Sequence, residues 1–269
     1  MLPSSIEAIE KDAALYEEKN FDKRAAAIDV IEFIDQADLR PRAEKIRAAF
    51  EKIDTGLFQR LRAAIRTGGI TFKDLINGYV DIHPDDTETG YDNLDIFING
   101  LTSFQAMPAQ TKELEPEMVY YQKTPARIVF ELVEKAHFTA SDVFFDIGSG
   151  LGQVAILVNL LAGIPVRGVE IDPAFCQYAR EQATDLHLSN ATFIHADARK
   201  ADYSGGTVFF MFTPFRGEIL QDVLAILQKE AASRKIRIVT YGPCTDQVAL
   251  QDWLEFANPG DRLGIFNSF

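Results

Sequence analysis

The segment DVFFDIGSGLGQVAIL, residues 142–157, places three glycines at alternate positions between two apolar stretches. The first stretch has the composition of a buried strand, and the second has the length and residue types of a helix. A strand that enters a helix through a glycine-rich turn directs backbone N–H groups at a ligand near the helix N-terminus. The segment therefore predicts an α/β fold with a small-molecule site at this turn.

Strand and helix patterns alternate through the rest of the C-terminal half. Strands are predicted at 143–148, 166–171, 191–196, 207–212 and 236–241, and helices at 124–137, 152–162, 173–187 and 216–232. Near-continuous apolar strands that alternate with helices indicate a parallel sheet covered on both faces. Residues 253–269 break the alternation and predict two antiparallel strands joined at Asn258-Pro259-Gly260. The expected α/β fold is a seven-stranded sheet of five parallel strands plus a C-terminal antiparallel hairpin.

The N-terminal part follows a different pattern. Residues 1 to about 80 have apolar residues at helical spacing, and Thr55-Gly56 is expected to separate two helices. Residues 81–111 are predicted to be an acidic, loop-rich connection with a short apolar patch around Leu94–Leu101. The Asp residues of this connection do not have the spacing of a calcium loop. We expect an all-helical domain with its acidic loop over 1–111 and a second domain over 112–269.

The charge is acidic along the whole chain. Lys and Arg number 27 against 40 Asp and Glu, which gives a formal net charge of −13. A phosphate-rich partner needs a basic surface, so no nucleic-acid or membrane partner is expected. No apolar stretch approaches the ~20 residues that span a bilayer, and the N-terminus has no signal-peptide pattern. Cys176 and Cys244 lack metal-ligand spacing, so we predict no metal site. We interpret them as free thiols in a reducing compartment and predict a cytoplasmic protein.

The spacing of the glycines limits the ligand. A dinucleotide fingerprint needs its third glycine three positions after the second, but Gly150 is followed by Gly152, and Gln153 stands at the fingerprint position. The P-loop ending Gly-Lys-Ser/Thr is also missing, and no Lys or Arg lies between 136 and 166. A ligand without phosphate, which presents an ammonium and a carboxylate to the turn, fits better. S-adenosylmethionine has these groups.

Two acidic residues at strand ends support this interpretation. Glu170 ends the second predicted strand, at the distance from the glycines where such folds place a carboxylate on ribose hydroxyls. Asp197 follows the third strand, where a carboxylate can accept a hydrogen bond from an adenine amino group. Asp172, directly before Pro173, is expected to begin a helix.

From about residue 116 to 269 the chain resembles the class I, seven-stranded Rossmann-like methyltransferases that depend on S-adenosylmethionine. The strings DIGSGLGQV and GVE are similar to those of the non-SET histone lysine methyltransferases, and PEMVYYQKT is similar to the Tyr-x-x-Thr loop of that group. The resemblance implies S-adenosylmethionine as cofactor. It marks the following residues as cofactor contacts: Tyr121, Thr124, Asp146, Gly148, Gly150, Gly152, Gln153, Glu170, Ile171, Asp197 and Ala198.

Thr213-Pro214-Phe215 follows the fourth strand, where the non-SET group has Asn-Asn-Phe. The tripeptide resembles the Asp/Asn-Pro-Pro-aromatic motif of many N-methyltransferases, in which a side chain and a backbone carbonyl accept hydrogen bonds from an amine. The resemblance implies that Thr213, Pro214 and Phe215 position the methyl acceptor, and it favours nitrogen. Tyr120 and Tyr241 are further candidates to line this site.

The sequence therefore predicts an S-adenosylmethionine-dependent methyltransferase that acts on a small molecule or a protein side chain. Two alternatives remain at this stage. One is a nucleotide-dependent oxidoreductase, and the other is a methyltransferase-like subunit that binds the cofactor without catalysis.

Overall fold

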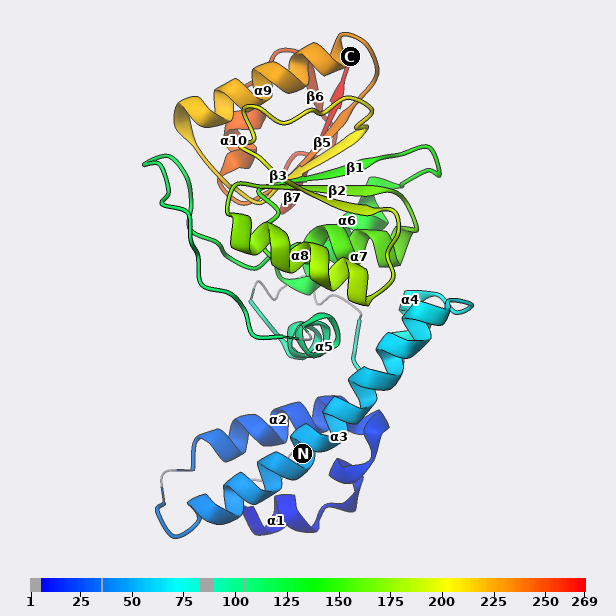
Figure 1. Cartoon of the computed structure of the whole chain (residues 1–269), viewed down its shortest axis with the longest axis vertical. Helices are drawn as coiled ribbons and strands as arrows, with labels where there is room; N and C mark the ends of the chain where they lie inside the picture. The colour runs from blue at the N-terminus through cyan, green and yellow to red at the C-terminus, as the bar shows by residue number, and fades with distance from the viewer. Residues whose placement is uncertain (1–5, 35, 83–89, 104) are drawn as a thin grey trace. The chain divides into compact units, whose positions relative to one another are not determined.

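A computed structural model describes residues 6–34, 36–82, 90–103 and 105–269 (Figure 1). The chain divides into two compact units, Met1–Gln105 and Ala106–Phe269. In the described part of the chain, no helix combines the length and the apolar character needed to cross a bilayer.

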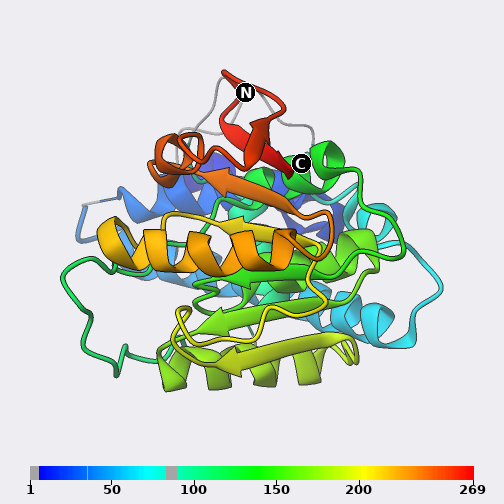
Figure 2. The ribbon, with the colours of Figure 1, turned by 90° about the horizontal axis from the view of Figure 1, so that it is seen from above.

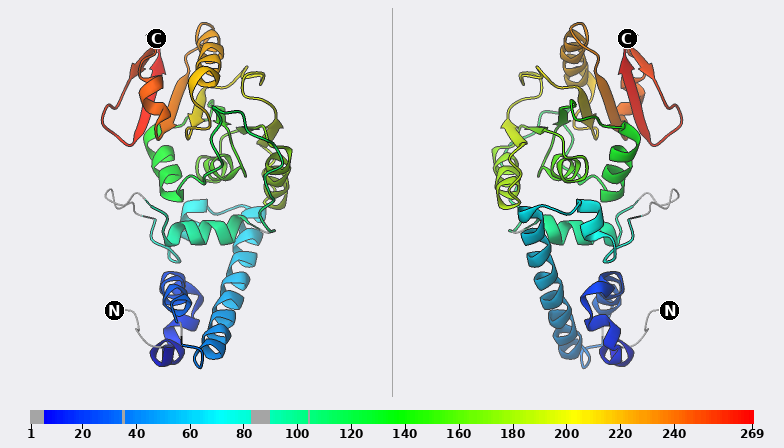
Figure 3. Two further views of the ribbon diagram at one scale, coloured as in Figure 1. Left: turned by 90° about the vertical axis from the view of Figure 1, so that its left-hand side faces the viewer. Right: turned by 90° about the vertical axis from the view of Figure 1, so that its right-hand side faces the viewer.

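The first unit is helical. Its described elements are α1 (Ile6–Lys11), the 3₁₀ turns η1 (Ala13–Tyr16) and η2 (Glu18–Asn20), α2 (Phe21–Glu32), α3 (Arg40–Thr67), α4 (Phe72–Ile76) and α5 (Asn93–Thr102). Figure 3 shows α3 as the long helix of this unit, with α5 across its C-terminal half. Edge-to-face contacts among Phe21, Phe58 and Phe97 join α2, α3 and α5.

The predicted break at Thr55-Gly56 is wrong, because α3 is one helix of 28 residues that runs through both of them. A glycine inside a helix lowers helix stability by only about 1 kcal/mol relative to Ala. The burial of neighbouring side chains on both sides of Gly56 stabilises the helix by more than this. Asp54 and Leu57 are buried, and the Thr55 hydroxyl donates to the Glu51 carbonyl instead of ending the helix.

The predicted loop over 81–111 contains the helix α5, which is a second correction. Asp92 caps α5 by accepting the N–H groups of Leu94 and Asp95, and the Asp95 carboxylate accepts the N–H of Asp92 in return. Such a reciprocal cap starts a short helix firmly. Asp92 and Asp95 thus serve the helix terminus. Asp85 and Asp86, from the same acidic stretch, lie outside the described residues.

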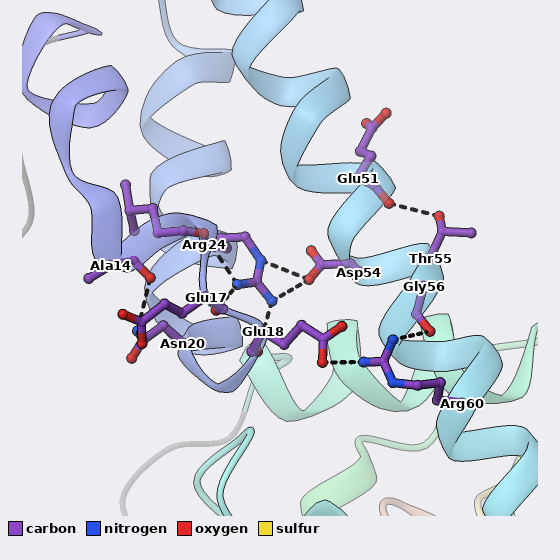
Figure 4. Close-up of polar contacts among 11 residues, drawn as sticks. Ala14, Glu17, Glu18, Asn20, Arg24, Glu51, Asp54, Thr55, Gly56 and Arg60 are labelled. Atoms are coloured by element: carbon purple, nitrogen blue, oxygen red, sulfur yellow. Dashed lines mark hydrogen bonds and ion pairs between the residues drawn. The ribbon is translucent and has the colours of Figure 1, made fainter.

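A buried ion pair joins α2 to α3 at Asp54, next to the predicted break (Figure 4). The fully buried Arg24 of α2 donates through Nε and Nη2 to Asp54 Oδ1, at 2.8 and 2.6 Å. Its remaining N–H groups donate to the carbonyl groups of Leu15, Glu17 and Glu18, in and beside the 3₁₀ turns. One guanidinium therefore fixes η1 and η2 against both α2 and α3.

Replacing Arg24 by Met would remove these donors while keeping an apolar side chain. Because Asp54 and the carbonyl groups would stay buried without partners, we expect the free energy of unfolding of the first unit to fall by about 3–5 kcal/mol. Urea unfolding of both proteins measures this difference. Arg42→Met is the control, since Arg42 pairs with Glu7 and Glu10 in solvent and its loss should shift the midpoint far less. Equal shifts for the two variants would contradict the assigned role of Arg24.

The second unit contains the predicted seven-stranded sheet, and this prediction is confirmed. Its strands are β1 (Phe144–Ile147), β2 (Val166–Glu170), β3 (Ala191–His195), β4 (Val208–Met211), β5 (Arg237–Tyr241), β6 (Leu254–Phe256) and β7 (Leu263–Ser268). They lie in the order β3-β2-β1-β4-β5-β7-β6, with β1–β5 parallel and the β6–β7 hairpin antiparallel (Figure 2).

Helices cover both faces of this sheet, as Figure 1 shows. On one face lie α6 (Ala126–Ala136), α7 (Gln153–Ala162) and α8 (Pro173–Asp185), and on the other lie α9 (Gly217–Ala231) and α10 (Cys244–Val248). The helix α10 has no counterpart among the predicted elements. The helix predicted over 124–137 begins at Ala126, after Pro125, which leaves Thr124 in the preceding loop.

The two faces of the strands bury different side chains. Phe145, Ile147 and Met211 point to the α9 side and pack in one apolar cluster with Leu220 and Leu224. Residue 146 points to the opposite face because successive side chains of a strand alternate. The sheet thus places Asp146 at the end of β1, on the side of α7 and α8.

Candidate active site

The glycine turn is held by the edge of β2. The N–H groups of Gly148 and Ser149 both donate to the Val169 carbonyl, at 2.9 and 3.0 Å. The next donor, Gly150 N–H, lies 2.7 Å from Glu170 Oε2. These bonds fold the chain over the carboxyl end of β2 before α7 begins at Gln153.

Glycine is required in this turn because the chain is left-handed and closely packed. Gly148 has φ 77°, and a Cβ there would lie 2.3 Å from Pro214 Cβ. Gly150 has φ 52°, and a Cβ there would lie 2.2 Å from Tyr121 Cε2. The turn therefore contacts both the predicted acceptor motif and the predicted Tyr-x-x-Thr loop directly.

A cavity of about 390 Å³ opens at the carboxyl ends of the strands. Parallel sheets bind their ligands at this edge. Its described lining includes every predicted site residue except Gly150 and Gly152, namely Tyr121, Thr124, Asp146, Gly148, Gln153, Glu170, Ile171, Asp197, Ala198, Thr213, Pro214 and Phe215. Gly152 instead packs against Ala179 and Phe193 at the start of α7. Tyr120 lies in the lining and is exposed, whereas Tyr241 is not among the described lining residues.

Three buried side chains around the turn fit a polar ligand. Asp146 Oδ2, Ser149 Oγ and both amide atoms of Gln153 are buried and have no hydrogen-bond partner within the described residues. Buried polar groups are almost always paired, so their grouping in one cavity indicates a ligand that completes them. The ammonium and carboxylate of S-adenosylmethionine match this set of donors and acceptors.

Burial strongly perturbs the acidic residues of the turn. Removal from water, against the opposing effect of the Ala155 N–H and with a contribution from the nearby Glu170, raises the pKa of Asp146 to about 7. Burial also raises the pKa of Glu170, against the N–H groups of Asp172 and Gly150 that favour its charged form. A ligand cation beside Asp146 would restore its charge.

Asp197 is positioned by Arg199. Both its carboxylate oxygens accept from the Arg199 guanidinium, at 2.7 to 3.2 Å, and Oδ1 also accepts the Arg199 N–H. These bonds hold the pKa of Asp197 below its usual range. The guanidinium reaches Glu115 on its other side, at 2.6 and 3.1 Å. These contacts use three N–H hydrogens of Arg199, because the Nε–H is shared by both oxygens, and a carboxylate offers about four acceptor positions, so Asp197 keeps one for an adenine amino group.

Thr213 has a strained backbone, and its hydroxyl is hydrogen-bonded within the protein. Its φ of 42° is rare for a residue other than glycine, and such strain is concentrated at functional sites. Its hydroxyl donates to the Tyr241 carbonyl and accepts the Cys244 N–H, both at 3.2 Å. The side chain therefore ties the ends of β4 and β5 together. The Tyr241 ring packs on Phe212, with centroids 4.9 Å apart.

Several lining residues have no counterpart in the sequence prediction. Ser149 lies inside the glycine segment, and its position between two glycines was the available signal. Pro243, Cys244 and Gln247 follow β5 at the carboxyl edge, where only their loop position could have indicated them. The Cys244 thiol is buried, which raises its pKa and keeps it protonated.

Comparison with known proteins now adds to this geometry. The model of the family described as "Histone methylation protein DOT1" matches residues 113–226. This range holds the glycine turn, both predicted acids and the Thr213-Pro214-Phe215 motif, and the sheet around it has the class I order with its antiparallel hairpin. The chain is an S-adenosylmethionine-dependent methyltransferase. Its core is similar to the non-SET histone lysine methyltransferases.

Solved structures of methyltransferases are also similar to part of this chain. An RNA methyltransferase from Salinibacter ruber in complex with S-adenosyl-L-homocysteine is 23% identical, with 55% of this chain and 92% of that chain covered and a TM-score of 0.43. A precorrin-6y C5,15-methyltransferase from Geobacter metallireducens is 16% identical, with coverage of 56% and 92% and a TM-score of 0.43. A SAM-dependent methyltransferase from Aquifex aeolicus is 16% identical, with coverage of 54% and 93% and a TM-score of 0.43.

Cofactor binding by this methyltransferase should depend on pH through Asp146. If the cofactor ammonium pairs with the ionised carboxylate, affinity rises as pH passes a pKa of about 7. We expect the Kd for S-adenosylmethionine to be about 10-fold higher at pH 6 than at pH 8. Isothermal titration at both values measures this ratio. In Asp146→Asn the affinity should be weaker and the pH dependence lost, and a ratio that stays the same in the variant would refute the pairing.

The same substitution has a distinct effect on stability. Because the unfolded carboxyl has a pKa of 3.8 and the folded one a pKa of about 7, the stability of the folded state falls as pH rises between these two values, and the full penalty is present at pH 8. Asp146→Asn removes that penalty. Its Tm without cofactor at pH 8 should therefore equal or exceed that of the unmodified protein, although cofactor binding is weakened. A lower Tm would show that the charged carboxylate contributes to the fold.

Proposed function

We propose that this methyltransferase transfers the methyl group to an amine nitrogen. The observation that carries the proposal is the distribution of carboxylates in the cavity. The carboxylates of the described lining are Asp146, Glu170, Asp172 and Asp197, and all of them lie at the end of β1 or β2 or shortly after β2 or β3. The half of the cavity built by β4, β5 and α9 has none, and no histidine is found among the described lining residues.

The half of the cavity built by β4, β5 and α9, here called the acceptor half, is mostly apolar. The residues that follow β4 and β5 or lie in α9 contribute Phe212, Pro214, Phe215, Ile219, Leu220 and Pro243, together with Thr213, Arg216, Cys244 and Gln247. The Cys244 thiol has a raised pKa and a hydroxyl such as that of Thr213 is no base. An acceptor here must therefore attack without help from a strong protein base. A neutral amine does so, whereas an alcohol has to lose a proton to a base.

Catalysis then rests on alignment and the exclusion of water. When bound in the cavity, S-adenosylmethionine would supply a methyl carbon activated by the positive sulfur. Attack by the nitrogen lone pair would form the N–C bond as the C–S bond breaks, with S-adenosyl-L-homocysteine as the leaving group, and the methylated ammonium would then lose its proton to solvent. The apolar walls hold the acceptor dry, which favours its neutral nucleophilic form, and the strained Thr213 fixes the carboxyl end of β4. With the Thr213 hydroxyl committed to β5, we assign the hydrogen bond from the amine to a backbone carbonyl of the motif.

A protein side chain is the acceptor that we would test first. The description of the matching family names histone methylation, which concerns those proteins and supports a lysine-like amine here. The formal net charge of −13 would also attract a cationic acceptor from solution. We further propose that the chain acts in the cytoplasm.

Labelling identifies the acceptor directly. Purified protein with S-adenosylmethionine labelled in its methyl group is incubated with a fractionated cell extract, and the modified species are analysed by mass spectrometry. The proposal predicts label on nitrogen, stable to alkaline hydrolysis that removes methyl esters. Label on oxygen or sulfur would overturn the choice of nitrogen. Absence of label in every fraction would favour a subunit that binds the cofactor without catalysis.

The pH dependence of the rate tests for a protein base. With an amine acceptor and saturating cofactor, kcat/KM should rise about tenfold per pH unit up to the pKa of the free amine, because only the neutral amine attacks. Two amines of different basicity should therefore show different limiting pKa values. A single limiting pKa shared by both acceptors would instead reveal a titrating group of the protein.

A further inference from the structure

Residues 111–119, here called the strap, cross the carboxyl edge of the sheet in the second unit. Figure 2 shows this segment, in turquoise to green, looping along the side on which the arrowheads of the parallel strands lie. The strap leads directly into Tyr121 and Thr124, which line the cavity. What fastens the strap therefore decides how those two residues face the cofactor.

Asp172, in the loop after β2, holds the start of the strap. Its Oδ2 accepts the N–H groups of Thr111 and Lys112, both at 2.6 Å, and its Oδ1 accepts the Thr111 hydroxyl at 3.0 Å. Oδ1 also caps α8 by accepting the N–H groups of Ala174 and Phe175. Only 2% of the Asp172 surface is exposed. Oδ1 of Asp172 therefore caps the helix, while Oδ2 binds only the strap.

The fastening continues into the glycine turn. The N–H of Asp172 donates to Glu170 Oε1 at 2.8 Å, and Glu170 Oε2 accepts the Gly150 N–H at 2.7 Å. Over Gly150 lies the Tyr121 ring, which also packs on Phe175 with centroids 5.4 Å apart. The strap, the proposed ribose-binding acid and the turn therefore form one hydrogen-bonded unit.

Two more attachments lie further along the strap. Glu115 is joined to Asp197 through Arg199, next to the proposed adenine contact. Beyond it, Glu117 Oε2 accepts the Ile219 N–H at 2.9 Å, and the Val119 N–H donates to the Pro214 carbonyl at 3.0 Å. The strap thus passes successive loops after β2, β3 and β4, and each attachment adjoins a residue of the cavity.

We propose that Asp172 is a positioning residue that keeps the strap closed and thereby slows the release of S-adenosylmethionine. It acts through Thr111 and Lys112, and needs no contact of its own with the cofactor. This inference rests on the assignment of the cavity as the cofactor site. It predicts that cutting the fastening raises the cofactor dissociation rate and KM, while kcat at saturating cofactor changes little.

Asp172→Ser separates the two roles of the side chain. Serine caps helices about as well as aspartate, so α8 should keep its N-terminus, but its side chain is too short to reach the strap. Because bonds to a charged acceptor are lost, we expect the dissociation rate of S-adenosylmethionine to rise about 10- to 100-fold in stopped-flow displacement. Asp202→Ser is the matched control, since Asp202 makes a similar loop bond to Ser204 away from the cavity.

Hydrogen exchange and a second substitution make the test specific. In Asp172→Ser without cofactor, the amides of Thr111 and Lys112 should exchange faster, while those of α8 stay protected. Thr111→Val, which removes one donor from the strap and leaves the helix cap intact, should raise the dissociation rate by a smaller factor. Combined with Asp172→Ser it should add nothing, because both changes break the same contact.

The outcomes separate this inference from the functional assignment. Normal cofactor binding with an unchanged dissociation rate in Asp172→Ser would overturn the role of Asp172 and leave the methyltransferase assignment intact. Faster exchange throughout α8 would assign Asp172 to the helix alone, which also overturns it. If the unmodified protein fails to bind S-adenosylmethionine, the cofactor site and this inference both fall.

Discussion

The buried carboxylate of Glu170 holds the active-site edge together. It accepts one N–H from the glycine turn after β1 and one from the loop after β2, and is itself 8% exposed. A charge this buried is tolerated only where donors surround it, and the carboxyl ends of two adjacent parallel strands supply them. Because Gly150 and Asp172 are fixed by this one group, the turn, the helix α8 and the strap all take their positions from it.

The same edge concentrates features that oppose stability. Asp146 is buried with a raised pKa, and Thr213 has a left-handed backbone. Ser149 and Gln153 have buried polar atoms without a hydrogen-bond partner among the described residues. The apolar cluster under α9 and the rigid sheet compensate for these costs. A ligand with an ammonium group and hydrogen-bonding hydroxyls would relieve most of them, which is how a preorganised site gains affinity.

The sheet and most of the residues that line the cavity were predictable because they follow local patterns. The apolar strand patterns predicted β1–β5, and the turn at Asn258-Pro259-Gly260 predicted the hairpin. Their position at strand ends indicated Glu170 and Asp197. Long-range contacts were not predictable in this way. Arg24 and Asp54, which are 30 residues apart, pair next to the predicted break in α3. Asp197 is held by Arg199, which also reaches Glu115, 84 residues earlier in the chain than Arg199. The Thr213 hydroxyl, predicted to face an acceptor, bonds to β5 instead.

The central claim is that the cavity at the carboxyl edge binds S-adenosylmethionine through the glycine turn. A crystal structure of the protein with S-adenosyl-L-homocysteine tests it most directly. The account predicts the amino-acid end of the ligand beside Asp146 and Gln153, the ribose hydroxyls on Glu170, and the adenine next to Asp197. A ligand bound elsewhere on the chain, with this cavity closed by protein side chains, would contradict it.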